Sequence, residues 1–398
     1  MAGAALQRWY AKVPAMALAF SVGRLILSVL LFAVALLAVA PVPVAMFWKP
    51  AVAAIEWGPA LACLCGVLVF SAVVDTRLAT AFAFSTSAAA LFLSASIRAS
   101  TASGEAANAY VAVFGSPPEL IDPRPAPFAW TSVVAPPPAK AQITTHRFST
   151  GAEPLSLDVY RNGEGIKPVV VAVHGGSWRS GDRHQLDSVY HYLAQRGWVV
   201  VSVDHTLAPQ AQFPTQKTDV VAAVRWVQQH ADKLGIDPRR VVLYGRSSGG
   251  HLALLAAYAS DLPGIRGVVA WYPPTDLNWS WANPGSRLVI DTQSILFDLM
   301  DGPPDDDPSL YNQANVLEVV RPGAPSTLVI HGGRDELVSA EQSRRLDRRL
   351  GELGVRHLYV ELPWATHGCD ANLNGPSGQI GLWLIERFMA TVAGEAPT

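Results

Sequence analysis

The chain has 398 residues, a formal net charge of −2 at pH 7, and a hydrophobic share of 50%. This near-neutral balance offers no electrostatic basis for binding nucleic acid or a strongly charged partner. The three cysteines argue against a disulfide framework, and no Cys or His spacing predicts a zinc site.

The N-terminal part of the chain is strongly apolar. Three runs, at 25–48, 57–74 and 78–97, contain no charged residue. Each approaches or exceeds the roughly 17–25 residues that a membrane-spanning helix needs. We therefore predict a membrane region over residues 1–98 with three transmembrane helices. The third run is rich in Ala, Ser and Thr, so a buried helix of a soluble domain is the alternative for it.

The basic residues that flank these runs predict an orientation. With three spans and a cytoplasmic N-terminus, the basic residues inside are Arg8, Lys12, Arg24 and Arg77, and those outside are Lys49 and Arg98. This distribution agrees with the positive-inside rule and places the remainder of the chain outside the cytoplasm. If the third run does not span, two helices remain and the rest of the chain faces the cytoplasm.

The remainder of the chain changes character twice. Residues 99–140 are rich in proline, which predicts a stiff, extended tether. From 141 to 398, apolar β-branched runs such as 168–174 alternate with amphipathic segments such as 218–234, which predicts an α/β domain with a mostly parallel sheet. Residues 276–321 mix Trp, Pro and Asp, and we expect them to form an insertion over the edge of that sheet.

The most informative motif is Gly-Arg-Ser-Ser-Gly at residues 245–249. It follows the apolar run 241–244 and precedes a helix-like apolar pattern. Glycines permit a sharp turn where a Cβ would collide with neighbouring backbone, so this context predicts a nucleophile elbow that presents Ser247 at the top of the sheet. An ordinary Gly/Ser loop is the alternative.

A serine nucleophile needs a base, and the base needs a carboxylate that orients it. Both are expected just beyond late strands, at the ligand end of the sheet. Asp335 follows one strand-like run and His367 follows the next, so they are the predicted acid and base. Glu336 is the alternative acid, and His357 is the alternative base.

Backbone N–H groups must also face the substrate oxygen on which negative charge develops. The segment His174-Gly175-Gly176-Ser177-Trp178 follows a strand-like run, and His174 is expected to brace this loop. We predict that the oxyanion donors are the N–H groups of Gly175, Gly176 and Ser248. Tryptophans near the predicted ligand end suggest a substrate pocket, and those selected are Trp178, Trp271 and Trp364.

Residues 142–395 resemble the α/β-hydrolase superfamily, within it the carboxylesterase and lipase branch with hormone-sensitive-lipase-like and acetyl-esterase-like enzymes. The resemblance is carried by the stretches above together with 203–209 and 235–241. The chain differs from the usual pattern of this branch at three places. Ser177 replaces the third glycine of His-Gly-Gly-Gly, His205-Thr206 replaces the usual Tyr-Arg after Asp204, and Arg246 precedes the predicted nucleophile where Asp is common.

The resemblance implies hydrolysis of a small-molecule or lipid ester through an acyl-enzyme, without a metal or organic cofactor. Acyl transfer with the same triad and an inactive hydrolase-fold scaffold are the alternatives. With the membrane prediction, the chain is expected to be a multi-pass, membrane-anchored serine esterase. Its α/β-hydrolase domain would follow an N-terminal bundle of transmembrane helices and lie outside the cytoplasm.

Overall fold

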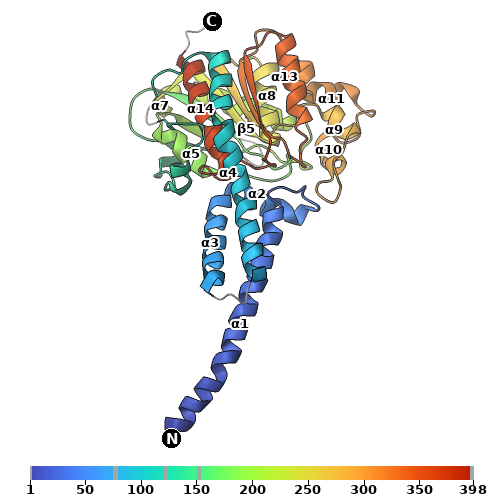
Figure 1. Cartoon of the computed structure of the whole chain (residues 1–398). Coiled ribbons are helices and arrows are strands. Elements are labelled where there is room, and N and C mark those ends of the chain that lie inside the picture. The colour runs from blue at the N-terminus through green and yellow to red at the C-terminus, as the bar shows by residue number, and fades with distance from the viewer. Residues whose placement is uncertain (1, 75–78, 121–122, 150–153, 395–398) are drawn as a thin grey trace.

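The computed structural model describes residues 2–74, 79–120, 123–149 and 154–394. Its centre is an eight-stranded sheet in the order β1-β2-β4-β3-β5-β6-β7-β8 (Figure 1). The strands are β1 (Gln142–Arg147), β2 (Ser156–Arg161), β3 (Lys167–Val173), β4 (Val199–Val203), β5 (Ile236–Arg246), β6 (Ile265–Trp271), β7 (Ser326–Gly332) and β8 (His357–Leu362). Strand β2 pairs antiparallel with β1 and β4, and the other neighbours are parallel, which confirms the predicted mostly parallel sheet.

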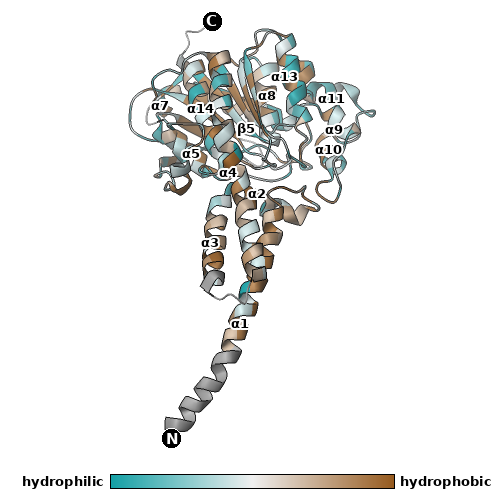
Figure 2. Cartoon of the chain, in the orientation of Figure 1, coloured by the Kyte–Doolittle hydropathy of each residue, from teal (hydrophilic) through white to brown (hydrophobic). Residues whose placement is uncertain are grey.

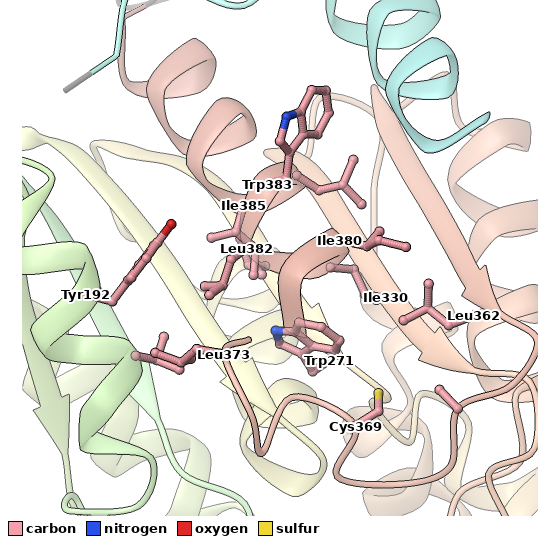
Figure 3. Packing of buried hydrophobic residues seen from close by; sticks show 14 of the residues in the cluster. Tyr192, Trp271, Ile330, Leu362, Cys369, Leu373, Ile380, Leu382, Trp383 and Ile385 are labelled. Atoms are coloured by element: carbon pink, nitrogen blue, oxygen red, sulfur yellow. The ribbon is translucent and has the colours of Figure 1, made fainter. Parts of the chain in front are cut away.

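Helices cover both faces of this sheet, which explains why its central strands are nearly continuous apolar runs. The helices of the domain are α5 (Asp187–Gln195), α6 (Thr215–Gln229), α7 (Ala231–Leu234), α8 (Ser248–Ala259), α9 (Leu277–Ala282), α10 (Thr292–Met300), α11 (Pro308–Ala314), α12 (Val316–Val319), α13 (Glu341–Glu352) and α14 (Pro376–Gly394). Val170 and Ala172 of β3 pack on the face covered by α5 and α14, whereas Val169, Val171 and Val173 pack with α6 and α8. Figure 3 shows part of the first layer, where α14 lies over Trp271 and Ile330.

Four N-terminal helices adjoin this domain: α1 (Ala2–Leu36), α2 (Trp48–Glu56), α3 (Gly58–Val74) and α4 (Ala79–Phe114). Helices α1 and α3 and the first half of α4 project away from the sheet, while α2 lies at its base (Figure 1). By length and composition, Met16–Leu36 and Ala79–Phe114 are apolar enough to cross a membrane. The pair Ala45–Glu56 and Gly58–Ser71 passes the same test together but is bent by 81°.

The predicted first span, 25–48, is not one helix. Helix α1 ends at Leu36, and the chain then turns through Pro41 and Pro43 into a short 3₁₀ helix, η1 (Ala45–Phe47), before α2 begins. Proline lacks a backbone N–H and its ring collides with the preceding helical turn, so an α-helix does not continue through these positions. We call residues 37–56 the strap.

The predicted tether at 99–140 is wrong over its first part. Residues 99–114 continue α4, which packs along α14: the rings of Tyr110 and Trp383 are 5.9 Å apart, and those of Phe114 and Phe388 are 5.3 Å apart. The prolines begin only after this helix, and a further 3₁₀ helix, η3 (Trp130–Val134), lies among them. Even there the chain is packed, since the Arg124 side chain is buried and donates to the Leu373 carbonyl (2.9 Å). The apolar N-terminal helices therefore join the α/β domain through a packed helix.

The predicted insertion contains α9 to α12, between β6 and β7. Leu296, Leu299 and Val316 pack in the same core as α8, the helix that follows the elbow. The insertion thus lies beside the carboxyl end of β5 and supplies one wall of the site described next.

Candidate active site

The elbow joins β5 to α8 directly. Ser247 lies between them with φ 54° and ψ −128°, a strained conformation for a residue with a side chain. A Cβ on Gly245 would lie 2.2 Å from the Gly249 carbonyl oxygen, and one on Gly249 would lie 2.2 Å from the Val173 carbonyl oxygen. Both positions therefore require glycine. The Ser247 N–H donates to the Trp271 carbonyl (2.9 Å), which holds the turn against β6.

The structure brings Ser247, Asp335 and His367 together. The His367 Nε2 atom is 3.0 Å from the Ser247 hydroxyl oxygen, and its Nδ1 atom is 2.7 Å from Asp335 Oδ2. An ionised carboxylate only accepts hydrogen bonds, so Nδ1 carries the proton and Nε2 is left to accept from the serine. This is the arrangement that a general base needs.

The surroundings of Asp335 keep it ionised. Burial raises the pKa of this carboxyl, but the charge of His367 and hydrogen bonds from His331 and His367 outweigh burial and hold the pKa well below its usual range. Its Oδ1 atom also accepts the N–H groups of Leu337 (2.9 Å) and Val338 (2.8 Å). A buried carboxylate fixed in this way can orient an imidazole and stabilise its protonated form.

The two alternatives lie elsewhere. Glu336 accepts hydrogen bonds from the Val42 N–H (3.0 Å) and the Thr366 hydroxyl (2.9 Å). His357 lies at the start of β8, where its Nε2 atom is 3.1 Å from Asp347 Oδ1. Among the described contacts neither is hydrogen-bonded to Ser247 or His367, although Glu336 lines the cavity beside Ser247.

The predicted oxyanion donors need one correction. The Gly175 N–H donates to the Gln185 side-chain oxygen at 2.8 Å, so that group is already occupied. Ser177, which has φ 56°, lines the cavity next to the nucleophile, as does Ser248. This leaves the N–H groups of Gly176, Ser177 and Ser248 as the candidate oxyanion donors. The sequence does contain a signal for Ser177: it stands where the His-Gly-Gly-Gly motif has its third glycine, the residue type that tolerates a positive φ.

Behind this loop lies a stack of two histidines. The rings of His174 and His205 are 4.3 Å apart and nearly parallel, and His174 Nδ1 lies 2.8 Å from the Gly175 carbonyl oxygen. Burial lowers the pKa of both side chains, that of His205 to about 3. Both are therefore neutral near pH 7, and His174 braces the loop.

A cavity of about 430 Å³ adjoins Ser247. Of the three predicted pocket tryptophans, only Trp178 lines it. Trp271 lies in the core instead (Figure 3), packed so closely on α14 that a Cβ on Gly381 would lie 2.1 Å from it. Trp364 is also buried, and its indole N–H donates to the Ser377 hydroxyl (3.0 Å).

Most of the cavity wall is apolar, and much of it was not predicted. The insertion contributes Leu277, Trp279, Ile290, Ile295 and Leu296, and the strap contributes Pro41 and Val42. Among the described residues, no group of three or more His, Cys, Asp or Glu side chains is placed to hold a metal ion.

A buried polar cluster lies beside the catalytic histidine candidate. Arg246 donates to Asp370 Oδ1 (2.7 Å) and to the Tyr272 hydroxyl (3.0 Å from Nε), and the Tyr272 hydroxyl donates to Asp370. The Tyr272 ring is 4.3 Å from the ring of His367. Only Arg246 was noted from the sequence, because Tyr272 and Asp370 belong to no recognisable motif.

Comparisons with known proteins agree with this geometry. A family model described as BD-FAE matches residues 157–350. The chain is similar to "Esterase LipC" of Mycobacterium tuberculosis, with 31% identity over 70% of this chain and 75% of that protein. It is also similar to "Esterase LipQ" of the same organism, with 28% identity over 58% of each chain. Among solved structures, the esterase of Pyrobaculum calidifontis has a TM-score of 0.57 and 24% identity, over 74% of this chain and 93% of that one. That likeness supports the fold alone. The chain belongs to the α/β-hydrolase family of carboxylesterases that includes LipC.

Proposed function

We propose that this protein is a membrane-anchored serine carboxylesterase. The observation that carries the proposal is the hydrogen-bonded series from Ser247 through His367 to Asp335. The names of the relatives LipC and LipQ, both esterases, support the reaction class.

In the first half-reaction, Ser247 attacks the ester carbonyl while His367 Nε2 takes the hydroxyl proton. Asp335 stabilises the imidazolium, and the N–H groups of Gly176, Ser177 and Ser248 stabilise the oxyanion. Each such donor contributes about 3 kcal/mol in well-studied hydrolases. The tetrahedral intermediate then collapses, and His367 returns the proton to the departing alcohol.

In the second half-reaction, water attacks the acyl-Ser247 carbonyl and His367 takes a proton from it. Collapse of this intermediate releases the carboxylic acid and restores the Ser247 hydroxyl. The same steps with an alcohol in place of water would transfer the acyl group, so the products distinguish the two reactions.

The proposed anchor has three passes, with α1, α3 and α4 crossing in turn, while α2 stays against the hydrolase domain. Helices α1 and α4 run towards the sheet and α3 runs away from it, which leaves the N-terminus and the hydrolase domain at opposite ends (Figure 1). With the basic flanks on the N-terminal side, this places the domain outside the cytoplasm. Alkaline phosphatase fused after α14 should then be active, and a cytoplasmic reporter at the same site should be silent; the reverse would refute this orientation.

The mechanism is tested by covalent labelling of the full chain in detergent. Wild type should react stoichiometrically with a fluorophosphonate and hydrolyse p-nitrophenyl esters, whereas Ser247→Ala should do neither. Ser260→Ala at the end of α8 is the matched control and should behave as wild type. Labelling of the Ser247→Ala variant would reject Ser247 as the nucleophile. Product analysis with added alcohols separates hydrolysis from acyl transfer.

A further inference from the structure

The strap forms hydrogen bonds with the loops that carry Asp335 and His367. Its Val42 N–H donates to Glu336, the neighbour of Asp335, and the Trp48 indole N–H donates to the carbonyl of His367 itself (2.8 Å). Arg334 donates to the carbonyl of Ala38 (2.5 Å). The segment that links the first apolar helix to the second therefore contacts the loops of both the acid and the base.

The strap also forms a hydrogen bond with the insertion, which lines another part of the cavity. The Ala45 N–H donates to the Leu288 carbonyl at 2.8 Å. Pro41 and Val42 of the strap and Val289 and Ile290 of the insertion line the cavity. These two segments therefore meet beside the cavity and together form part of its wall.

Large apolar side chains project from these two segments into the surroundings. Met46 is 74% exposed, Phe47 is 38% exposed and Leu288 is 67% exposed, and we call these three residues the rim. Met46 and Phe47 lie in η1, between α1 and α2, and Leu288 lies beside them because the Ala45 N–H donates to its carbonyl. Figure 2 shows hydrophobic residues along α1 and α3 where these helices project from the domain. Exposed apolar residues next to candidate membrane helices are typical of a surface that dips into a bilayer.

The charges of the cavity restrict the ligand further. Its lining includes two acidic residues, Asp335 and Glu336, and no Lys or Arg among the described lining residues. A phosphate headgroup would find no basic partner there, and it would face two carboxylates. An uncharged ester with a long acyl chain suits the apolar wall better.

We propose that the cavity opens onto the bilayer surface and takes an uncharged, acylglycerol-type lipid ester whose chain passes over the rim. This inference rests on the proposed function, since Ser247 would cleave that ester by the steps given above. The membrane helices then bring the active site to its substrate as well as anchoring it.

The test uses the full chain reconstituted in phosphatidylcholine vesicles that contain diolein. Turnover of diolein is divided by turnover of soluble p-nitrophenyl butyrate, and both are normalised to fluorophosphonate-labelled enzyme, which excludes misfolded protein. The combined variant Met46→Ser, Leu288→Ser should lower this ratio by about tenfold, because membrane engagement scales with buried apolar area. Ile166→Ser is the matched control: its side chain is 77% exposed but precedes β3, at the opposite end of the strands.

The possible outcomes separate the two proposals. A lowered ratio in the rim variant with an unchanged ratio in Ile166→Ser supports the inference. An unchanged ratio in the rim variant, or a wild type that cleaves only the soluble ester, overturns it and leaves the esterase proposal standing. Release of fatty acid from phosphatidylcholine as fast as from diolein overturns the preference for an uncharged ester. A wild type that is labelled by no fluorophosphonate and cleaves neither ester refutes the proposed function itself.

Discussion

Replacing Asp370 by Asn should destabilise the protein strongly. The Arg246–Asp370 pair is nearly buried, with side-chain exposures of 12% and 3%, and its atoms are 2.7 Å apart. Burial lowers the pKa of Arg246, but Asp370 and Tyr272 outweigh it and the pKa lies above its ordinary value. A guanidinium is not deprotonated in a protein, so Arg246 stays charged in the variant and loses its counter-charge.

Removing one partner of a buried ion pair costs about 3–5 kcal/mol. Asn keeps an oxygen acceptor for Arg246, so we expect a loss at the lower end, about 3 kcal/mol. The matched control is Glu361→Gln, which breaks the Arg344–Glu361 pair at the same 2.7 Å but with side-chain exposures of 43% and 28%. Water screens such pairs, and their loss costs about 0–1 kcal/mol.

The assay is thermal unfolding of the full chain in detergent, followed by near-ultraviolet circular dichroism. At roughly 2–4 °C per kcal/mol for a domain of this size, Asp370→Asn should lower Tm by on the order of 10 °C, and Glu361→Gln by a few degrees at most. Because the Tyr272 ring packs against His367, kcat for p-nitrophenyl butyrate should fall as well. Equal Tm losses in the two variants would refute the reasoning that burial makes this pair costly to break.

Three further predictions concern the site and its surroundings. Asp335→Asn should lower kcat by about 10⁴-fold through the wrong imidazole tautomer, whereas Glu336→Gln should lose less than about tenfold; the reverse pattern would move the acid to Glu336. Trp48→Phe keeps an aromatic ring near His367 but leaves the His367 carbonyl without its hydrogen bond, so the variant should lose about 1–3 kcal/mol of stability in denaturant titrations and some kcat. Wild-type values of both would show that the Trp48–His367 hydrogen bond contributes to neither stability nor catalysis. The pKa of His205 is about 3 in the folded protein, against 6.5 for an unperturbed histidine, so the unfolded chain binds more protons between these values and the protein loses stability as the pH is lowered through them. About 2 kcal/mol of the free energy of unfolding should be lost by pH 5, and His205→Gln should flatten this dependence on pH.

The parts of the site that could be predicted from the sequence are those with local signals. The elbow needs Gly245 and Gly249 within a few residues of Ser247, and the turn between β5 and α8 allows little else. Asp335 and His367 could be placed because each follows a strand of a parallel sheet, and the carboxyl ends of such strands meet at one edge. Because the strands are parallel, residues that follow different strands in the sequence lie close together in the fold.

The errors have equally specific causes. The place of Trp271 at the end of a strand predicts a pocket residue, but Trp271 shares its face with Val269, and both belong to the core under α14. Strand alternation would have separated them from Val268 and Ala270, which face the other side. The predicted tether begins at residue 99, but its prolines start only at 117, and the proline-free residues before them are compatible with a helix.

The strap had no sequence signal because its contacts join residues about 300 positions apart, and only the folded chain reveals them. Its presence changes what counts as the catalytic unit. A fragment cut at residue 140 would keep Ser247, Asp335 and His367 but lose Pro41 and Val42 from the cavity wall and the Trp48 bond to the histidine loop. It would also uncover the part of α14 that α4 packs against. Since an orienting shell sets the positions of catalytic groups to fractions of an ångström, we expect the fragment to lose activity with soluble esters, and the N-terminal helices to support catalysis as well as forming the proposed anchor.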